Sequence, residues 1–263
     1  MKKIIAILLA VMMLGAIACT AKTSVGQPKN EEVNELPPET AADTTADNTE
    51  SNAGNIELPE LSAGGWTVVG DGKAQLPEEG EAAFKAVMEN LVGATYEPVA
   101  FLGSQVVAGT NYSILCTRTL VTANPVTDLA VLTIYRDLEG NAQLLNVADF
   151  DIGTYAQAED SGAPEQLMGG WYAPETAEAM NAMPEKAATA YAQALEGFVG
   201  NKLTPVALLG TQLVAGTNYA FLCHSKLVTL EPVYSMQLVV IYADLQGNAT
   251  ITNIVTINPA DFN

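Results

Sequence analysis

One pair of neighbouring residues has the types that covalent catalysis uses. Cys223 is followed directly by His224, the single histidine of the 263-residue chain. A thiol and an imidazole can act as nucleophile and base when both side chains reach the same point. Here both residues fall in an apolar, β-favouring run at 217–228, and neighbouring side chains of a strand point to opposite faces. The pair therefore cannot act together, and we expect that the chain is not an enzyme.

Other chemistry is equally poorly supplied. Thr117 follows Cys116 at the place that matches His224, so the pair does not recur. No histidine, cysteine or acidic residues have metal-ligand spacing, and no glycine-rich phosphate loop is present, so we expect no metal and no cofactor. We predict that Cys116 and Cys223 are small buried core residues, with a disulfide between them as the alternative in an exported protein. His224 is expected to be exposed.

The chain repeats itself at a spacing of 107 residues. The matching pairs are Gln105 and Gln212, Gly109 and Gly216, Cys116 and Cys223, and Gly140 and Gly247. A period this long suits two complete small domains rather than the units of a solenoid. We predict a first domain over 63–151, a polar linker over 152–167 and a second domain over 168–263.

Each repeat has the same order of structural signals. One amphipathic helix is predicted first, from the spacing of Phe84, Val87, Met88 and Leu91 and of Tyr191, Ala194, Leu195 and Phe198. Gly93 and Gly200 stand where these helices should end. Four β-favouring runs follow, at 98–107, 110–121, 129–138 and 142–147 and at 205–214, 217–228, 236–245 and 249–255. The prediction is an α+β fold, with one helix packed on a four- to five-stranded antiparallel sheet in each domain. His224 then belongs to the sheet face away from the helix.

The connection between the first two strands is apolar in both repeats. It reads Gln105-Val106-Val107-Ala108-Gly109 in the first and Gln212-Leu213-Val214-Ala215-Gly216 in the second. Glycine supplies the backbone angles of a tight turn. The apolar residues beside it approach a solvent-facing tip, which indicates that another molecule docks there.

These segments resemble the cystatin family, and the stefin branch in particular. The family's inhibitory first hairpin carries Gln-x-Val-x-Gly, and Thr-Asn-Tyr follows it here at 110–112 and 217–219. Gly64-Gly65 and Gly169-Gly170 resemble the family's N-terminal glycine trunk, and Leu138-Glu139-Gly140 and Leu245-Gln246-Gly247 occupy the place of its second hairpin. Many cystatins have Pro-Trp there and stefins often Leu-Pro-Gly. Burial of the Glu139 carboxylate would weaken docking of the first domain.

The resemblance implies two tandem cystatin-like domains that inhibit papain-like cysteine proteases reversibly. The trunk and two hairpins of each domain would enter the protease cleft, with Ala63 or Met168 just before the trunk offered to a substrate pocket. The implied protease-binding residues are Gly64, Gly65, Gln105, Val106, Val107, Ala108, Gly109, Leu138, Gly140, Met168, Gly169, Gly170, Gln212, Leu213, Val214, Ala215, Gly216, Leu245 and Gly247. The alternative is a non-inhibitory surface lipoprotein that uses the two domains as protein-binding or scaffold modules. Trp66 and Trp171 follow the trunks, with either the core or a partner as their surroundings.

The N-terminal part of the chain predicts export. Two lysines precede an apolar run from Ile4 to Ile17, which is too short to span a bilayer, and Cys19 follows at a lipobox-like site. We expect a lipoprotein signal peptide at 1–18, lipid on Cys19, a disordered acidic stalk over 19–62 and attachment to a bacterial cell envelope; signal cleavage and secretion is the alternative. The net charge of −19 opposes binding to nucleic acid, and we expect a monomer whose contact with the membrane is through the lipid alone.

Overall fold

The computed structural model describes residues 64–156 and 169–263, apart from 69, 71 and 73. The expected signal peptide, Cys19, the stalk, Ala63 and Met168 lie outside the described residues. We call 64–156 repeat 1 and 169–263 repeat 2. Both belong to one compact unit of the chain. No helix in these described ranges has the length and apolar character needed to cross a membrane.

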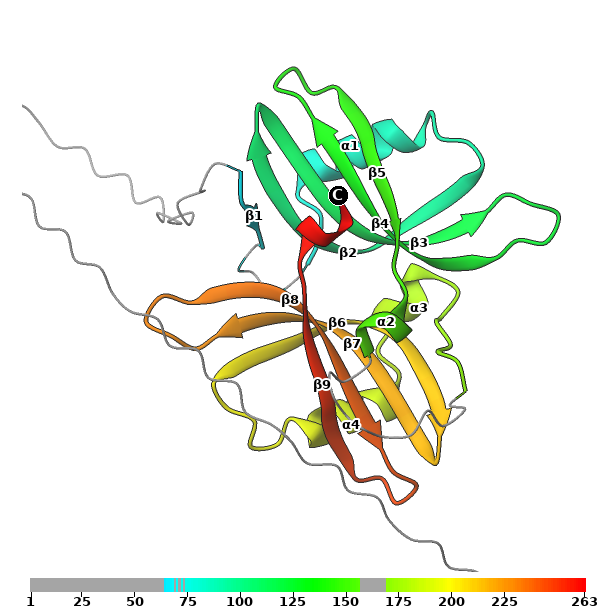
Figure 1. Cartoon of the computed structure of the whole chain (residues 1–263), viewed down its shortest axis with the longest axis vertical. Helices are drawn as coiled ribbons and strands as arrows, with labels where there is room; N and C mark the ends of the chain where they lie inside the picture. Colours follow the sequence, from blue (N-terminus) through cyan, green and yellow to red (C-terminus); the bar gives the residue numbers. More distant parts are fainter. Residues whose placement is uncertain (1–63, 69, 71, 73, 157–168) are drawn as a thin grey trace, which may run out of the picture. The chain divides into compact units, whose positions relative to one another are not determined.

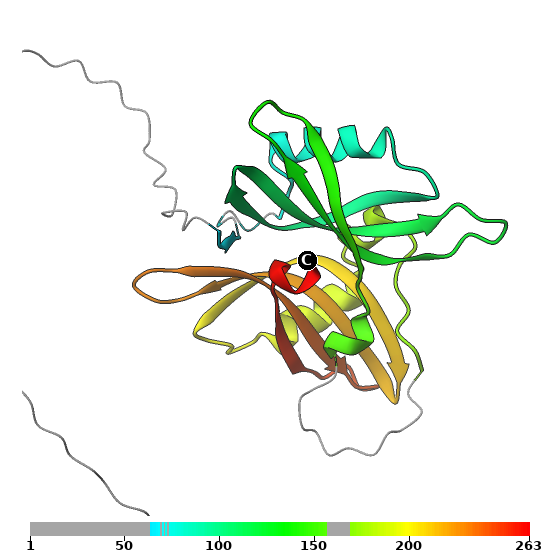
Figure 2. The ribbon, with the colours of Figure 1, turned by 45° about the horizontal axis from the view of Figure 1, so that its top comes forward.

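Repeat 1 is one helix on an antiparallel sheet with the strand order β1-β2-β3-β4-β5. Its elements are β1 (Trp66–Thr67), α1 (Glu78–Met88), β2 (Ala94–Val107), β3 (Gly109–Leu120), β4 (Thr127–Arg136), β5 (Ala142–Asp149) and the short helix α2 (Ile152–Ala156). Figures 1 and 2 show α1 lying across one face of this sheet. Ala83 and Val87 are the apolar side chains that α1 buries there.

Repeat 2 has the same plan, with the strand order β6-β7-β8-β9. Its elements are α3 (Ala177–Asn181), α4 (Glu185–Ala194), β6 (Asn201–Val214), β7 (Gly216–Leu227), β8 (Val233–Ala243), β9 (Ala249–Ile257) and the 3-10 helix η1 (Pro259–Phe262). Tyr172 forms a single bridge with Thr211, at the place where β1 pairs with β2 in repeat 1. The chain is therefore α+β, with two antiparallel sheets built from the runs that the sequence indicated.

Both main helices end earlier than their apolar periodicity predicts. Helix α1 ends at Met88 and α4 at Ala194, so Leu91 and Phe198 lie in the loops that follow. Gly93 and Gly200 have positive φ angles of 91° and 89° and start the turn into β2 and β6 rather than capping a helix.

The sheet faces away from α1 and α4 are covered as well. One apolar cluster contains buried side chains of both repeats, among them Leu115 of β3, Leu222 of β7 and Phe262 of η1. Residues 152–156, the start of the predicted polar linker, form α2, and Ile152 is buried in this cluster. The two sheets consequently share a core between the faces that point away from α1 and α4.

The shared core corrects the expectation for His224, which is buried rather than exposed. Its ring lies 5.7 Å from that of Tyr234, and a Cβ on Gly72 of repeat 1 would lie 3.9 Å from its Nδ1 atom. His224 is on the face opposite the helix, as alternation along the strand requires, but that face is not open to solvent. Cys116 and Cys223 are buried free thiols on the helix side, which confirms their prediction as core residues.

Candidate functional site

The first hairpin of each repeat turns on a single residue. Val107 pairs with Gly109 across the β2–β3 ladder, which leaves Ala108 alone at the tip. Gly109 has a φ of 134°, and a Cβ there would overlap the carbonyl oxygen of Arg136 on β4. Gly216 has the same conformation, with a φ of 138°. Glycine is thus required by the close approach of β4 in repeat 1 and β8 in repeat 2, as well as by the turn.

A tyrosine on β4, or on β8 in repeat 2, holds the tip of the hairpin in place. The Tyr135 hydroxyl donates a hydrogen bond to the carbonyl oxygen of Ala108 at 2.5 Å. In repeat 2, Tyr242 donates to Ala215 at 2.7 Å. The sequence analysis did not select these tyrosines, although both follow an isoleucine at the same 107-residue spacing. They fix the carbonyl at the apex of each hairpin.

The glutamine at the start of the first hairpin binds the glycine trunk. The Gln105 Nε2 group donates to the carbonyl oxygen of Gly64 at 2.8 Å, and its Oε1 accepts from Asn111 Nδ2 at 2.8 Å. The Gly64 amide also donates to the carbonyl of Val106 at 3.3 Å. Asn111 therefore orients the glutamine amide, and the glutamine holds the trunk beside the hairpin.

Repeat 2 has the same arrangement. Gln212 donates to the carbonyl oxygen of Gly169 at 2.9 Å and accepts from Asn218 at 2.8 Å. This explains why glutamine and the asparagine six residues later occur together in both repeats. Without the asparagine, the glutamine side chain would lose the partner that sets its orientation.

The second hairpin ends at the same end of the sheet as the first. Arg136, at the end of β4, pairs with Thr110 at the start of β3, so the turn at 138–140 lies next to the Ala108 tip. The Asp137 carboxylate shapes this turn by accepting from the backbone and side-chain amides of Asn141, and these hydrogen bonds hold its pKa below the usual value. Asp244 and Asn248 repeat the same turn in repeat 2.

These three segments form one surface in each repeat, which we call edge 1 and edge 2. Edge 1 consists of Gly64, Gly65, the hairpin 105–109 and the turn 138–140, and edge 2 of Gly169, Gly170, the hairpin 212–216 and the turn 245–247. The structure thus brings together, within each repeat, every described residue that the sequence analysis selected.

The edges carry exposed apolar side chains. Leu138 and Leu245 are 82% and 80% exposed at the second turn. At the first hairpin, Val107 is 44% exposed in edge 1 and Leu213 is 78% exposed in edge 2, whereas Val106 and Val214 are half-buried. The exposed large apolar side chain of the hairpin is therefore one position earlier in edge 2 than in edge 1.

The buried thiols are unsuited to chemistry. Burial raises the pKa of the Cys223 thiol to about 12, even though a hydrogen bond with the Tyr191 hydroxyl acts to lower it, and burial raises the pKa of Cys116 as well. A neutral thiol without access to solvent is neither a nucleophile nor a metal ligand. Within the described ranges, no group of three or more histidine, cysteine or acidic side chains could hold a metal ion.

Comparison with known proteins adds no assignment to this geometry. No protein-family model matches the chain, and a search of curated proteins finds no match either.

Proposed function

We propose that the chain is a reversible protein inhibitor of papain-like cysteine proteases, built from two tandem cystatin-like domains. Edge 1 and edge 2 each enter the active-site cleft of a protease. The inhibitor undergoes no reaction, and binding comes from burial of the apolar tips together with hydrogen bonds from the trunk backbone.

One observation carries the proposal. In both repeats a glycine trunk, a Gln-x-Val-x-Gly-type hairpin and a leucine-bearing second turn meet at one end of the sheet with their apolar side chains exposed. Exposed apolar tips cost stability and solubility unless a partner covers them. The hairpin apexes are braced by Tyr135 and Tyr242 and the trunks by Gln105 and Gln212, so little conformational entropy is lost on docking.

The experiment compares two pairs of substitutions in residues 20–263 of the chain. The edge variant carries Val107→Asp and Leu213→Asp, at the exposed large apolar side chains of the two hairpins. The control variant carries Val92→Asp and Val199→Asp, which are almost fully exposed in the helix-to-strand loops at the other end of each sheet. Each chain is titrated against papain that hydrolyses a fluorogenic peptide.

We expect tight inhibition by the unmodified chain and by the control variant. The edge variant should inhibit about 100-fold less tightly or worse, because an unpaired carboxylate at a desolvated contact costs several kcal/mol. Absence of inhibition of papain and of related cysteine proteases by the unmodified chain would refute the proposal. Equal loss in the edge and control variants would move binding away from the edges.

We further propose that the chain is exported and held at a bacterial cell envelope by lipid on Cys19. The support is the sequence of residues 1–19 alone. Expression in a bacterium with labelled palmitate should give a labelled, membrane-fractionated protein, and Cys19→Ser should abolish both the label and the fractionation. A labelled Cys19→Ser chain would contradict this assignment.

A further inference from the structure

The contacts between the two repeats are reciprocal. Asn146 of β5 donates from Nδ2 to the carbonyl oxygen of Phe262 at 2.7 Å, and Asn253 of β9 donates from Nδ2 to the carbonyl oxygen of Tyr155 at 3.3 Å. Asn146 and Asn253 are 107 residues apart, and so are Tyr155 and Phe262. The short segment after the last strand of each repeat therefore lies on the sheet of the other repeat. This is the pattern of an isologous, two-fold interface.

A second pair of reciprocal contacts fixes the direction of the two sheets. A Cβ on Gly210 would lie 2.8 Å from the Cδ1 atom of Ile152, and a Cβ on Gly103 would lie 3.4 Å from the Cγ atom of Pro259. Gly103 and Gly210 stand two residues before Gln105 and Gln212, so both are close to an edge. Ile152 and Pro259 follow the last strand of each repeat, which ends at the opposite end of the sheet because β5 and β9 run antiparallel to β4 and β8.

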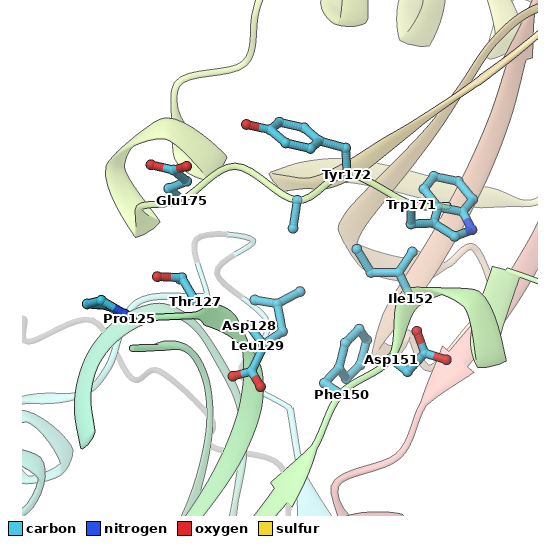
Figure 3. A pocket seen from close by; sticks show the side chains of 11 residues that line it. Pro125, Thr127, Asp128, Leu129, Phe150, Asp151, Ile152, Trp171, Tyr172 and Glu175 are labelled. Atoms are coloured by element: carbon cyan, nitrogen blue, oxygen red, sulfur yellow. The ribbon is translucent and has the colours of Figure 1, made fainter. Parts of the chain in front are cut away.

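A cavity of about 560 Å³ is lined by residues of both repeats and shows which ends of the two sheets lie together. Its wall from repeat 1 includes Pro125 and Thr127, in and beside the β3–β4 loop, which is the end of the sheet remote from edge 1. Its wall from repeat 2 includes Trp171 and Tyr172, directly after the trunk of edge 2. Figure 3 shows Pro125 and Thr127 opposite Glu175 and Tyr172 in this cavity. The end of repeat 1 remote from its edge thus lies beside edge 2.

The two-fold-related contact is present between edge 1 and the far end of repeat 2. Gly70, which follows β1 and so lies near edge 1, packs against the ring of Tyr234. Tyr234 is at the start of β8, next to the β7–β8 loop and remote from edge 2. Each edge is therefore beside the far end of the other repeat, and edge 1 and edge 2 lie at opposite ends of the paired sheets.

The shared core keeps this arrangement fixed. The cluster contains four fully buried side chains from the two sheets: Leu115, Val131, Leu222 and Leu238. Hinge motion between the repeats would expose these side chains to water. An interface of this kind does not open freely, in contrast to a polar contact between domains joined by a linker.

From this geometry we propose that one chain binds two protease molecules at once, one at each end, and that the two sites act independently. The inference rests on the proposed function of the edges. Because the edges point to opposite ends of a fixed pair of sheets, they cannot both enter one compact enzyme. The chain links two separate protease molecules, and avidity for a single enzyme is excluded.

The test is native mass spectrometry of residues 20–263 with an excess of papain. We expect a complex of one chain with two papain molecules. Val107→Asp alone and Leu213→Asp alone should each reduce this to one papain per chain, with the dissociation constant of the remaining site changed less than about twofold. The matched controls Val92→Asp and Val199→Asp should keep two.

The alternative outcomes are separate from one another. If the unmodified chain binds only one papain molecule, the inference is overturned. This holds both when each single variant still binds one molecule and when one of the variants binds none. A complex with two papain molecules in which loss of one site changes the affinity of the other more than tenfold also overturns the independence. No complex at all refutes the proposed function itself and not the geometry of the repeats.

Discussion

Phe262 tests whether the two repeats unfold as one unit. It stands one residue before the C-terminus of repeat 2 but packs on the sheet of repeat 1, where it is 4% exposed. Its ring lies 6.0 Å from that of Phe150 and 6.2 Å from that of Tyr155, both contributed by repeat 1. Phe262→Ala removes a buried aromatic side chain, which costs about 3 to 5 kcal/mol of unfolding free energy.

The chain contains a natural probe for each repeat. Cys116 reports opening of repeat 1 and Cys223 opening of repeat 2, because both thiols are fully buried in the cores under α1 and α4. The assay measures the rate of thiol labelling in Cys116→Ala and Cys223→Ala chains of residues 20–263, in urea that lets the unmodified chain label within hours. When opening and closing are fast, this rate follows the population of the open state.

If the shared core couples the repeats, Phe262→Ala should accelerate labelling of both thiols by the same factor, between about one hundred and several thousand. Leu230→Ala is the control, since this leucine is fully exposed in the β7–β8 loop and its loss should cost no more than about 1 kcal/mol. Acceleration of one thiol with less than a tenfold change in the other would refute the coupling.

Three further predictions follow from the edges and the cores. Gly109→Ala and Gly216→Ala should destabilise the chain and weaken inhibition more than Gly247→Ala does, because a Cβ at the first two positions overlaps a carbonyl oxygen of the neighbouring strand whereas the third has open space; chemical denaturation and papain titration measure both, and equal effects at all three would contradict the reasoning. Hydrogen bonds from Asn141 and Asn248 lower the pKa of Asp137 and Asp244 in the folded state, so these turns add stability above the ordinary aspartate pKa of about 3.9, and that stability is lost as the pH falls through the lowered folded value. The difference in unfolding free energy from an Asp137→Ala, Asp244→Ala chain should therefore shrink in acid. A difference that stays constant down to pH 2 would contradict this. Residues 20–263, which lack Cys19, should resist iodoacetamide at pH 8 when folded and react with two equivalents in denaturant, because burial raises the pKa of Cys116 and Cys223 and keeps both thiols neutral. Rapid alkylation of Cys223 in the folded state would show that its core is open.

The main elements of the fold were predictable because the signals are local. Apolar runs separated by turn residues gave each long strand, and the 107-residue repetition supported each assignment with a second copy. The helix ends were not, because Leu91 and Phe198 continue the apolar spacing after the backbone has left the helix. Side-chain periodicity reports which residues meet the core and not where the backbone hydrogen bonds stop.

The shared core was missed although the strands carry a signal for it. Ile114 and Leu115 are consecutive and both fully buried, as are Leu238 and Val239. Consecutive buried side chains mean that both faces of a sheet are covered, while a single helix can cover only one. The prediction of an exposed His224 failed for this reason, since it treated the face away from the helix as open to water.

The residues of the edges were found from sequence, but the interactions that hold them were not. Gln105 and Gly64 are 41 positions apart, and no local pattern shows that a glutamine amide reaches the trunk. The same holds for Tyr135, which is 27 positions from the carbonyl that it binds. Contacts between distant segments depend on strand pairing, so they become visible only in the assembled sheet.

The reciprocal interface also has a consequence for how the two edges can change over evolutionary time. The same two-fold contacts between separate single-repeat chains would form a homodimer, which dissociates on dilution and in which every substitution alters both ends at once. With both copies on one chain, the interface persists at any concentration and each end mutates alone. Glu139 in one turn and Gln246 in the other, and Val106 against Leu213, are differences of this kind. The binding surface of one edge can thus change while that of the other edge is kept.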